Sequence, residues 1–96
     1  LSRFPSVRRD LAFLVDENLT VETILKTMEE AKEGFVRELA LFDLYQGQGV
    51  PAGQKSLAFR VVMQDTERTL TEPEVEAAVM QIAESVISRH GAKLRS

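Results

Sequence analysis

The chain has 96 residues, no cysteine and a formal net charge of −3, from 12 basic and 15 acidic side chains. This length fits one small domain, and the lack of cysteine excludes disulfides, thiolate metal ligands and a cysteine nucleophile. An acidic balance argues against bulk electrostatic attraction of nucleic acid, but it leaves room for a small and specific contact. We therefore expect a single cytoplasmic domain over residues 1–96, with no membrane-spanning segment and no binding of DNA.

The N-terminal part is expected to begin with a connecting segment and continue as a strand. Residues 1–6 are interpreted as an extended lead-in from a preceding domain, because Pro5 disfavours helical geometry just before it. The chain begins at Leu1 rather than Met, which we interpret as part of a longer polypeptide. Residues 8–16 then alternate between apolar and other side chains, which predicts the first strand.

A helix and a second strand are expected next. Thr20 can cap a helix that runs to about Lys32, because apolar residues recur along one stripe and Gly34 supplies a stop. Residues 35–46 return to a period of two, which predicts the second strand. Glu38 falls on an apolar parity, so either it lies beyond the edge of the core or a bulge intervenes there.

The C-terminal half repeats this pattern of strand and helix. A loop at 47–54, rich in glycine and proline, leads to a third strand at 55–64. Thr71 and Glu74 have the spacing of a capping box, and the helix that they open is expected to end near residues 90–91.

Residues 92–95 complete the order β-α-β-β-α-β as a short last strand. This order is the split βαβ arrangement of ferredoxin-like folds. The sequence therefore predicts an α+β domain, with a four-stranded antiparallel sheet, two helices on one of its faces and the other face open.

Strand alternation assigns side chains to the two faces of this sheet. The bulkier apolar parity is expected to face the helices: Leu11, Phe13, Val15, Phe42, Leu44, Leu57, Phe59, Val61 and Met63. The open face is then expected to carry Ala12, Leu14, Leu39, Leu41, Asp43, Tyr45, Ser56, Ala58, Arg60, Val62, Lys93 and Arg95. An aromatic ring with arginine and small residues on an open sheet is typical of surfaces that bind single-stranded RNA.

Six short segments carry a family resemblance that spans nearly the whole chain: Phe4-Pro5, Arg9-Asp10-Leu11-Ala12, Phe42-Asp43-Leu44-Tyr45-x-Gly47, Lys55-Ser56-Leu57-Ala58, Arg68-Thr69-Leu70-Thr71 and Gly91-Ala92-Lys93-Leu94-Arg95. In this order and spacing they resemble the ferredoxin-fold anticodon-binding domain at the C-terminus of bacterial phenylalanyl-tRNA synthetase β subunits. The resemblance implies a domain that binds the anticodon stem-loop of phenylalanine tRNA, catalyses nothing and needs no cofactor. Aminoacylation, which uses ATP and magnesium, would take place on the α subunit of an (αβ)₂ enzyme that also contains the rest of the β subunit.

The resemblance also implies five positions for anticodon contact, all on the expected open face: Ala12, Asp43, Tyr45, Ser56 and Arg95. Tyr45 offers a ring on which a base can stack, and the Asp43 carboxylate suits the adjacent N–H donors of guanine, the first anticodon base. Arg95 can stack on a base or pair with phosphate, Ser56 can donate or accept a hydrogen bond, and Ala12 leaves room for a base. Two further cations are secondary RNA candidates, Arg60 and Lys93.

Other interpretations of these residues stay open. Asp43 and Arg95 could form a surface ion pair instead. An enzyme of the acylphosphatase type would need a phosphate cradle in the first strand-to-helix loop, but residues 16–19 hold two acids and no glycine, which would repel phosphate. A small-ligand regulatory module that dimerises through sheet edges, or a docking domain whose apolar open-face residues meet a neighbouring domain, would need no RNA.

Overall fold

The structure is a computed structural model that describes residues 4–95. Its elements are β1 (Val7–Asp16), α1 (Val21–Ala31), β2 (Val36–Tyr45), β3 (Gln54–Met63), α2 (Glu72–His90) and β4 (Lys93–Arg95). The predicted order is confirmed, and each predicted boundary lies within about two residues of the observed one. Residues 1–3 of the expected lead-in lie outside the described residues, and residues 4–6 are in neither helix nor strand.

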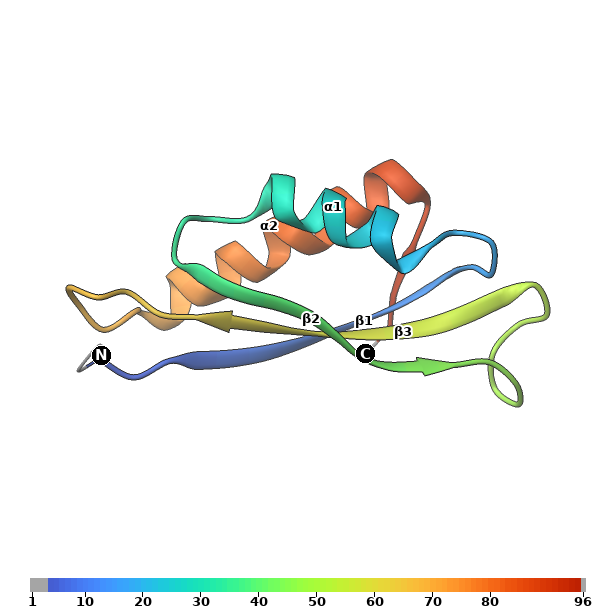
Figure 1. The fold of residues 1–96 in the computed structure, drawn as a ribbon, viewed down its shortest axis with the longest axis horizontal. Helices are drawn as coiled ribbons and strands as arrows, with labels where there is room; N and C mark the ends of the chain where they lie inside the picture. The colour runs from blue at the N-terminus through green and yellow to red at the C-terminus, as the bar shows by residue number, and fades with distance from the viewer. Residues whose placement is uncertain (1–3, 96) are drawn as a thin grey trace.

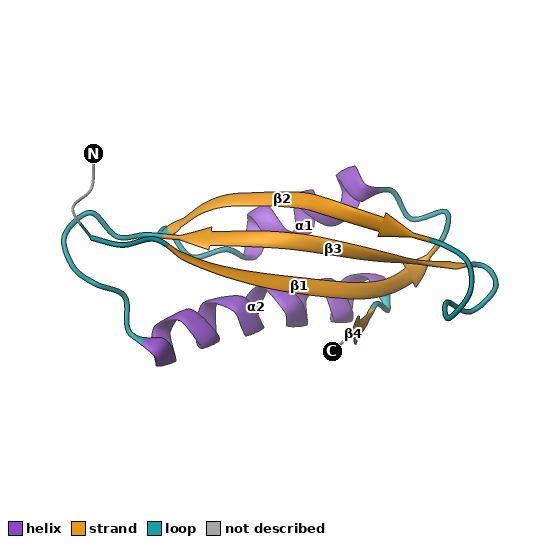
Figure 2. Cartoon of the chain, turned by 90° about the horizontal axis from the view of Figure 1, so that it is seen from below, coloured by secondary structure: helices purple, strands orange, loops and turns teal. Residues whose placement is uncertain are grey.

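The four strands form one antiparallel sheet in the order β2-β3-β1-β4, and both helices lie on the same side of it (Figure 1). Viewed from the opposite side, β2, β3 and β1 lie in front of the helices with no helix over them (Figure 2). The prediction of a ferredoxin-like α+β fold with one open sheet face is thus confirmed.

The core fills the space between the helices and the sheet. Phe13 of β1 and Phe59 of β3 are fully buried, with ring centroids 6.3 Å apart. Ile24 and Met28 of α1 and Ile82 of α2 are also fully buried. Full burial of a side chain of this size stabilises the fold by roughly 1.5–3 kcal/mol. Burial of the apolar residues of β1 and β3 against the helices therefore leaves the alternate residues of these strands on the open face.

The start of α2 is held by the predicted capping box. The Glu74 carboxylate accepts a hydrogen bond from the Thr71 backbone N–H at 2.9 Å, and the Thr71 hydroxyl accepts one from the Glu74 N–H at 3.3 Å. Arg68 donates two further hydrogen bonds of 2.6 Å to the same carboxylate. These bonds, that of Arg68 first, lower the pKa of Glu74 from 4.5 to about 2.

The end of α1 lies within one residue of the predicted Lys32, but Gly34 does not form it. Its last helical residue is Ala31, and Lys32 already has extended geometry with φ −78° and ψ 148°. The carbonyl of Ala31 accepts a hydrogen bond of 2.6 Å from the Gln81 side chain of α2. The predicted stop at Gly34 is therefore wrong, because the chain leaves helical geometry earlier and α2 satisfies an end carbonyl.

The first half of β2 contains a bulge. Val36 and Glu38 lie opposite the consecutive residues Met63 and Val62 of β3, so Arg37 is the extra residue. Val36 is buried under the helices, and Glu38 lies on the open face beside Val62. Of the two alternatives considered for Glu38, the bulge is confirmed.

A second bulge, which was not predicted, changes the face assignment of β2. Leu41 and Asp43 lie opposite the consecutive residues Phe59 and Ala58, so Phe42 is extra. Residues directly opposite each other in an antiparallel pair share a face. Leu41 therefore lies on the helix-covered face with Phe59, and Asp43 lies on the open face with Ala58.

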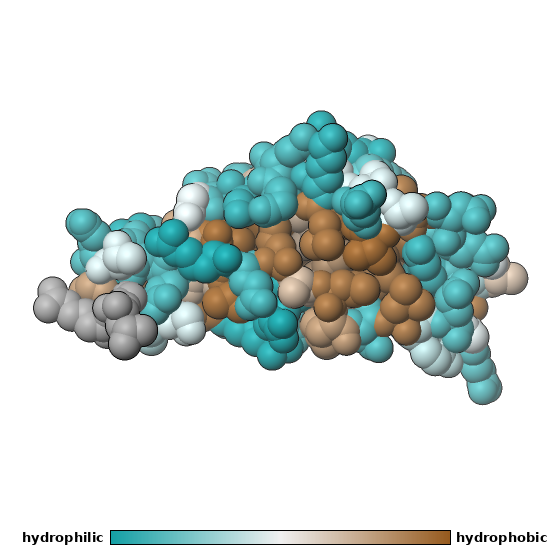
Figure 3. All heavy atoms as spheres, viewed as in Figure 1, coloured by the Kyte–Doolittle hydropathy of each residue, from teal (hydrophilic) through white to brown (hydrophobic). Residues whose placement is uncertain are grey.

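Three predicted assignments in β2 are wrong for this reason. Leu39, which pairs with Val61, and Leu41 lie on the helix-covered face, where both pack against the core. Phe42, predicted to be in the core, is 46% exposed. Leu44 was also predicted to be in the core; it keeps the predicted face, opposite Leu57, but it is 49% exposed at the edge of the sheet. In Figure 3 hydrophobic surface gathers between α1 and β2, on the helix-covered side of this edge strand.

Candidate nucleic-acid interface

Cross-strand pairing arranges the open-face side chains in rows that run across the sheet. The first row, in the order β2, β3, β1, β4, consists of Asp43, Ala58, Ala12 and Arg95. The second row, in the same order, consists of Tyr45, Ser56, Leu14 and Lys93. All five residues predicted for anticodon contact lie in these two adjacent rows, and Lys93 ends the second.

The first row has a charged residue at each end and two alanines between them. Asp43 and Arg95 lie on the two edge strands, three strand spacings or about 14 Å apart between backbones. Their side chains form no hydrogen bond or ion pair with any of the described residues. The alternative of an ion pair between them is therefore wrong, and the methyl groups of Ala12 and Ala58 leave a shallow surface between the two charges.

Tyr45 is fixed against the loop that follows β2. Its hydroxyl donates a hydrogen bond of 2.8 Å to the Gln48 carbonyl, and its side chain is 43% exposed. Gly47 has φ 131°, which other residues rarely adopt, and a Cβ there would lie 3.5 Å from the Tyr45 hydroxyl. The ring is thus held in one position while much of it faces solvent, as a stacking platform requires.

Ser56 is the least accessible of the five predicted contact residues. It is only 9% exposed, because its neighbours in the second row, Tyr45 and Leu14, are larger. A base could reach its hydroxyl only from above, beside the Tyr45 ring.

Two further rows continue the open face away from the loop at 47–53. The third row consists of Ala40, Arg60 and Asp10, and the fourth row consists of Glu38, Val62 and Arg8. Ion pairs join these rows, with Arg8 3.0 Å from Asp10 and Arg60 3.4 Å from Glu38. The Arg8 guanidinium also lies 5.3 Å from the ring centroid of Phe42.

Sequence reasoning missed Phe42 and Arg8 as members of this surface. A signal was present, because the helix-facing residues of β2 are Val36, Leu39, Leu41 and Leu44, at spacings of three, two and three. Each spacing of three marks one inserted residue in a two-residue period.

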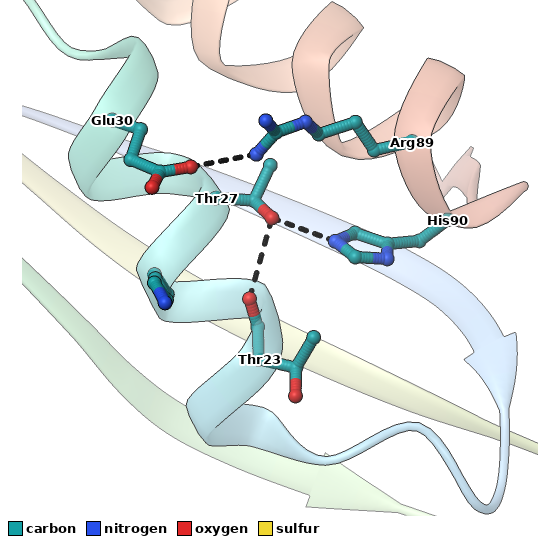
Figure 4. Close-up of a pocket in the computed structure, with 6 residues that line it drawn as sticks. Thr23, Thr27, Glu30, Arg89 and His90 are labelled. Atoms are coloured by element: carbon teal, nitrogen blue, oxygen red, sulfur yellow. Dashed lines mark hydrogen bonds and ion pairs between the residues drawn. The ribbon is translucent and has the colours of Figure 1, made fainter.

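A hollow on the opposite side of the molecule lies between α1 and the C-terminal end of α2 (Figure 4). Its lining residues are Thr23, Lys26, Thr27, Glu30, Arg89 and His90. The Thr27 hydroxyl is 2.7 Å from His90 Nε2, and Arg89 donates a hydrogen bond of 2.7 Å to Glu30, which lowers the pKa of that carboxyl. These polar groups satisfy one another across the helix pair, so we assign the hollow to helix packing.

No group of three or more His, Asp or Glu side chains among residues 4–95 is placed to hold a metal ion. None of the described helices is both long enough and apolar enough to cross a membrane.

Comparison with known proteins identifies the family. Residues 2–95 match the family model described as "Ferredoxin-fold anticodon binding domain". The chain is 50% identical over 96 residues to a "Phenylalanine--tRNA ligase beta subunit" of Thiobacillus denitrificans, 46% to that of Dechloromonas aromatica and 45% to that of Nitrosospira multiformis. Each alignment covers 100% of this chain and 12% of the relative. The chain therefore belongs to the family of ferredoxin-fold anticodon-binding domains.

Proposed function

We propose that this domain binds the anticodon stem-loop of phenylalanine tRNA on its open face, through the first and second rows. The observation that carries this proposal is the placement of Ala12, Asp43, Tyr45, Ser56 and Arg95 in two adjacent rows of an uncovered sheet. An aromatic platform beside an acceptor and small residues matches the way in which unstacked RNA bases are held on sheets.

Each row has a distinct part in this proposal. A base stacks on the Tyr45 ring, which is worth about 1–3 kcal/mol in sites of this kind. The Asp43 carboxylate accepts from the two N–H groups on the Watson–Crick edge of guanine, and Ala12 lets the base approach the backbone. Arg95 and Lys93, on β4, face the phosphates that follow. Most of the proposed contacts are with bases and few are with phosphates. Such binding does not need a positively charged protein, so it is compatible with the net charge of −3.

The relatives suggest the wider setting. We propose that the domain itself catalyses nothing and binds no cofactor, and that it serves a cytoplasmic phenylalanine–tRNA ligase as part of its β subunit. Aminoacylation with ATP and magnesium would then take place elsewhere in an (αβ)₂ enzyme, on the α subunit.

An amide-shift titration tests the binding proposal. The 96-residue chain is titrated with an RNA hairpin that carries the phenylalanine anticodon, and a hairpin with uridines in place of the anticodon serves as the control. We expect the largest shifts at the first and second rows, and weaker shifts with the control. Shifts confined to α1 and α2, or equal responses to both hairpins, would rule out base reading by these rows.

A second candidate function, docking against another domain of a parent protein, is favoured by the apolar surface between α1 and β2 (Figure 3). Val21, Leu25, Leu39 and Leu41 are only partly buried there, and Leu44 is 49% exposed. This surface lies on the helix-covered side, so docking and RNA binding would use different faces. In a full-length β subunit, Leu44→Asp should then increase proteolytic release of this domain while the isolated domain keeps its affinity for RNA; unchanged release would exclude docking at Leu44.

A further inference from the structure

We propose that the open face holds a second RNA subsite next to the first row, in which Phe42 stacks on an unpaired base and Arg60 binds a phosphate. The subsite rests on the proposed function, because it extends the same surface along the third and fourth rows. Its ligand is a nucleotide of the anticodon loop that flanks the bases held by Tyr45 and Asp43.

The first support is the position of Phe42. The bulge in β2 places its side chain next to Asp43, where the ring is 46% exposed on a face that no helix covers. Tyr45 lies three residues further along the same strand and shares this face. Two exposed aromatic rings on one β-strand can each stack on one base. Single-stranded nucleic acids are commonly bound in this way, with successive bases on successive rings.

Arg8 of β1 holds the Phe42 ring from across β3, on the same open face of the sheet. Its guanidinium lies 5.3 Å from the ring centroid, within the range of a cation–π contact, and Asp10 holds it through a hydrogen bond of 3.0 Å. The ring keeps its 46% exposure with Arg8 in place, so the contact leaves area for a base.

Arg60 has hydrogen-bonding capacity that the protein does not satisfy. Its Nε is buried and donates to no acceptor in the described part of the chain. Its Nη2 lies 3.4 Å from Glu38, whereas the hydrogen bonds from Arg68 to Glu74 measure 2.6 Å. A phosphate offers shorter and bidentate bonds to a guanidinium, so it can displace Glu38 from Arg60.

Continuity with the first row favours RNA over a protein as the occupant. Arg60 pairs with Ala40 and Asp10 in the row directly beside Asp43 and Ala58. A strand of RNA that leaves the first row along the sheet meets Arg60 and Phe42 within about one nucleotide length, roughly 6–7 Å, since neighbouring same-face residues are two strand positions apart.

The test uses the 96-residue chain and the hairpin with the phenylalanine anticodon, labelled with a fluorescent adenine analogue at loop positions beside the anticodon. Phe42→Leu keeps an apolar side chain but removes the ring, and its matched control is Leu44→Ala, a similarly exposed residue of the same strand on the other face. We expect Phe42→Leu to weaken binding about fivefold or more and to abolish quenching of one flanking label. Phe42→Trp should restore both, and Leu44→Ala should change neither.

The phosphate contact has its own readout. Arg60→Gln should reduce the slope of log affinity against log salt concentration by about 0.7, the value for one phosphate on a single strand. Arg89→Gln removes the same charge from the helix side and should leave the slope unchanged. Thermal unfolding of each variant, followed by circular dichroism, shows that the fold is kept.

The two proposals fail separately in this experiment. If Phe42→Leu and Arg60→Gln bind like the wild-type chain while Tyr45→Ala binds weakly, the second subsite is wrong and the anticodon site stands. If the wild-type chain does not bind the hairpin at all, both proposals fall.

Discussion

Phe42 and Asp43 together lie opposite a single residue of β3, Ala58, so consecutive side chains of β2 share the open face. This bulge lets Leu41 face the core while both Asp43 and Tyr45 face away from it. A strand with a strict two-residue period could not satisfy all three positions, because odd-numbered residues would then share one face.

Deletion of Phe42 should therefore leave the domain folded. Leu41 and Asp43 would become adjacent in the chain, opposite the adjacent residues Phe59 and Ala58, and regular alternation would place each on its present face. We expect native-like amide spectra, with cross-strand proton contacts from Leu41 to Phe59 and from Asp43 to Ala58. Loss of the Asp43 contact to Ala58, with Leu41 moved to the open face, would contradict this account of the bulge.

Substitution of Tyr45 separates stacking from loop anchoring. Tyr45→Phe loses the hydrogen bond to Gln48 but keeps the ring, so its affinity for the anticodon hairpin should stay within about twofold of the wild-type value. Tyr45→Ala removes the platform and should weaken binding by about 5- to 150-fold. Equal losses for both variants in a fluorescence titration would show that the hydroxyl, rather than the ring, makes the contact.

Asp43 should discriminate guanine from inosine, which lacks the exocyclic amine. The wild-type chain should bind the hairpin with inosine more weakly, by about 1.5–3 kcal/mol for one hydrogen bond to a charged acceptor. Asp43→Asn keeps one acceptor oxygen and places an amide donor where the second acceptor is needed, so the difference between the two hairpins should shrink. If the variant still prefers guanine by the same factor, another residue reads that edge.

The Arg68–Glu74 contact should make stability depend on acid pH. The pKa of Glu74 is lowered from 4.5 to about 2 in the folded chain, so its stabilising effect is fully present above pH 4.5 and is lost as the pH falls toward 2. Between these pH values the melting temperature of the wild-type chain should fall more steeply than that of Glu74→Gln. If the melting temperatures of the two proteins fall equally steeply over this pH range, the contact does not stabilise the folded state.

Much of the fold follows from local patterns in the sequence. The parity of β1 and β3 is unambiguous, because Leu11, Phe13 and Val15 and the facing residues of β3 are all buried on one side. The capping box at the start of α2 is likewise predictable, because a Thr followed three residues later by a Glu is the sequence pattern of this motif, here Thr71 and Glu74. These elements were predicted correctly because each is determined by contacts close in sequence or by a large difference in burial.

The errors in β2 have a physical origin. Between Leu39 and Leu44, apolar side chains occur at both odd and even positions. Hydrophobicity alone therefore did not show at which residue the alternation between the two faces shifts. Asp43 and Tyr45 were nevertheless placed correctly, because they follow the second bulge, whereas Leu39 and Leu41 precede it. Phe42 was assigned to the core for its size, and only pairing with β3 shows that it lies on the open face.

Proton contacts between RNA and protein methyl groups test the central claim most directly. Ala12 and Ala58 form the floor of the first row and have methyl groups that a bound base must approach. In the complex with the anticodon hairpin, we expect intermolecular nuclear Overhauser effects from base protons to both alanine methyls and to the Tyr45 ring. Contacts from the bases to the exposed Thr23 methyl of α1, with none to Ala12 or Ala58, would contradict an anticodon site on the open sheet face.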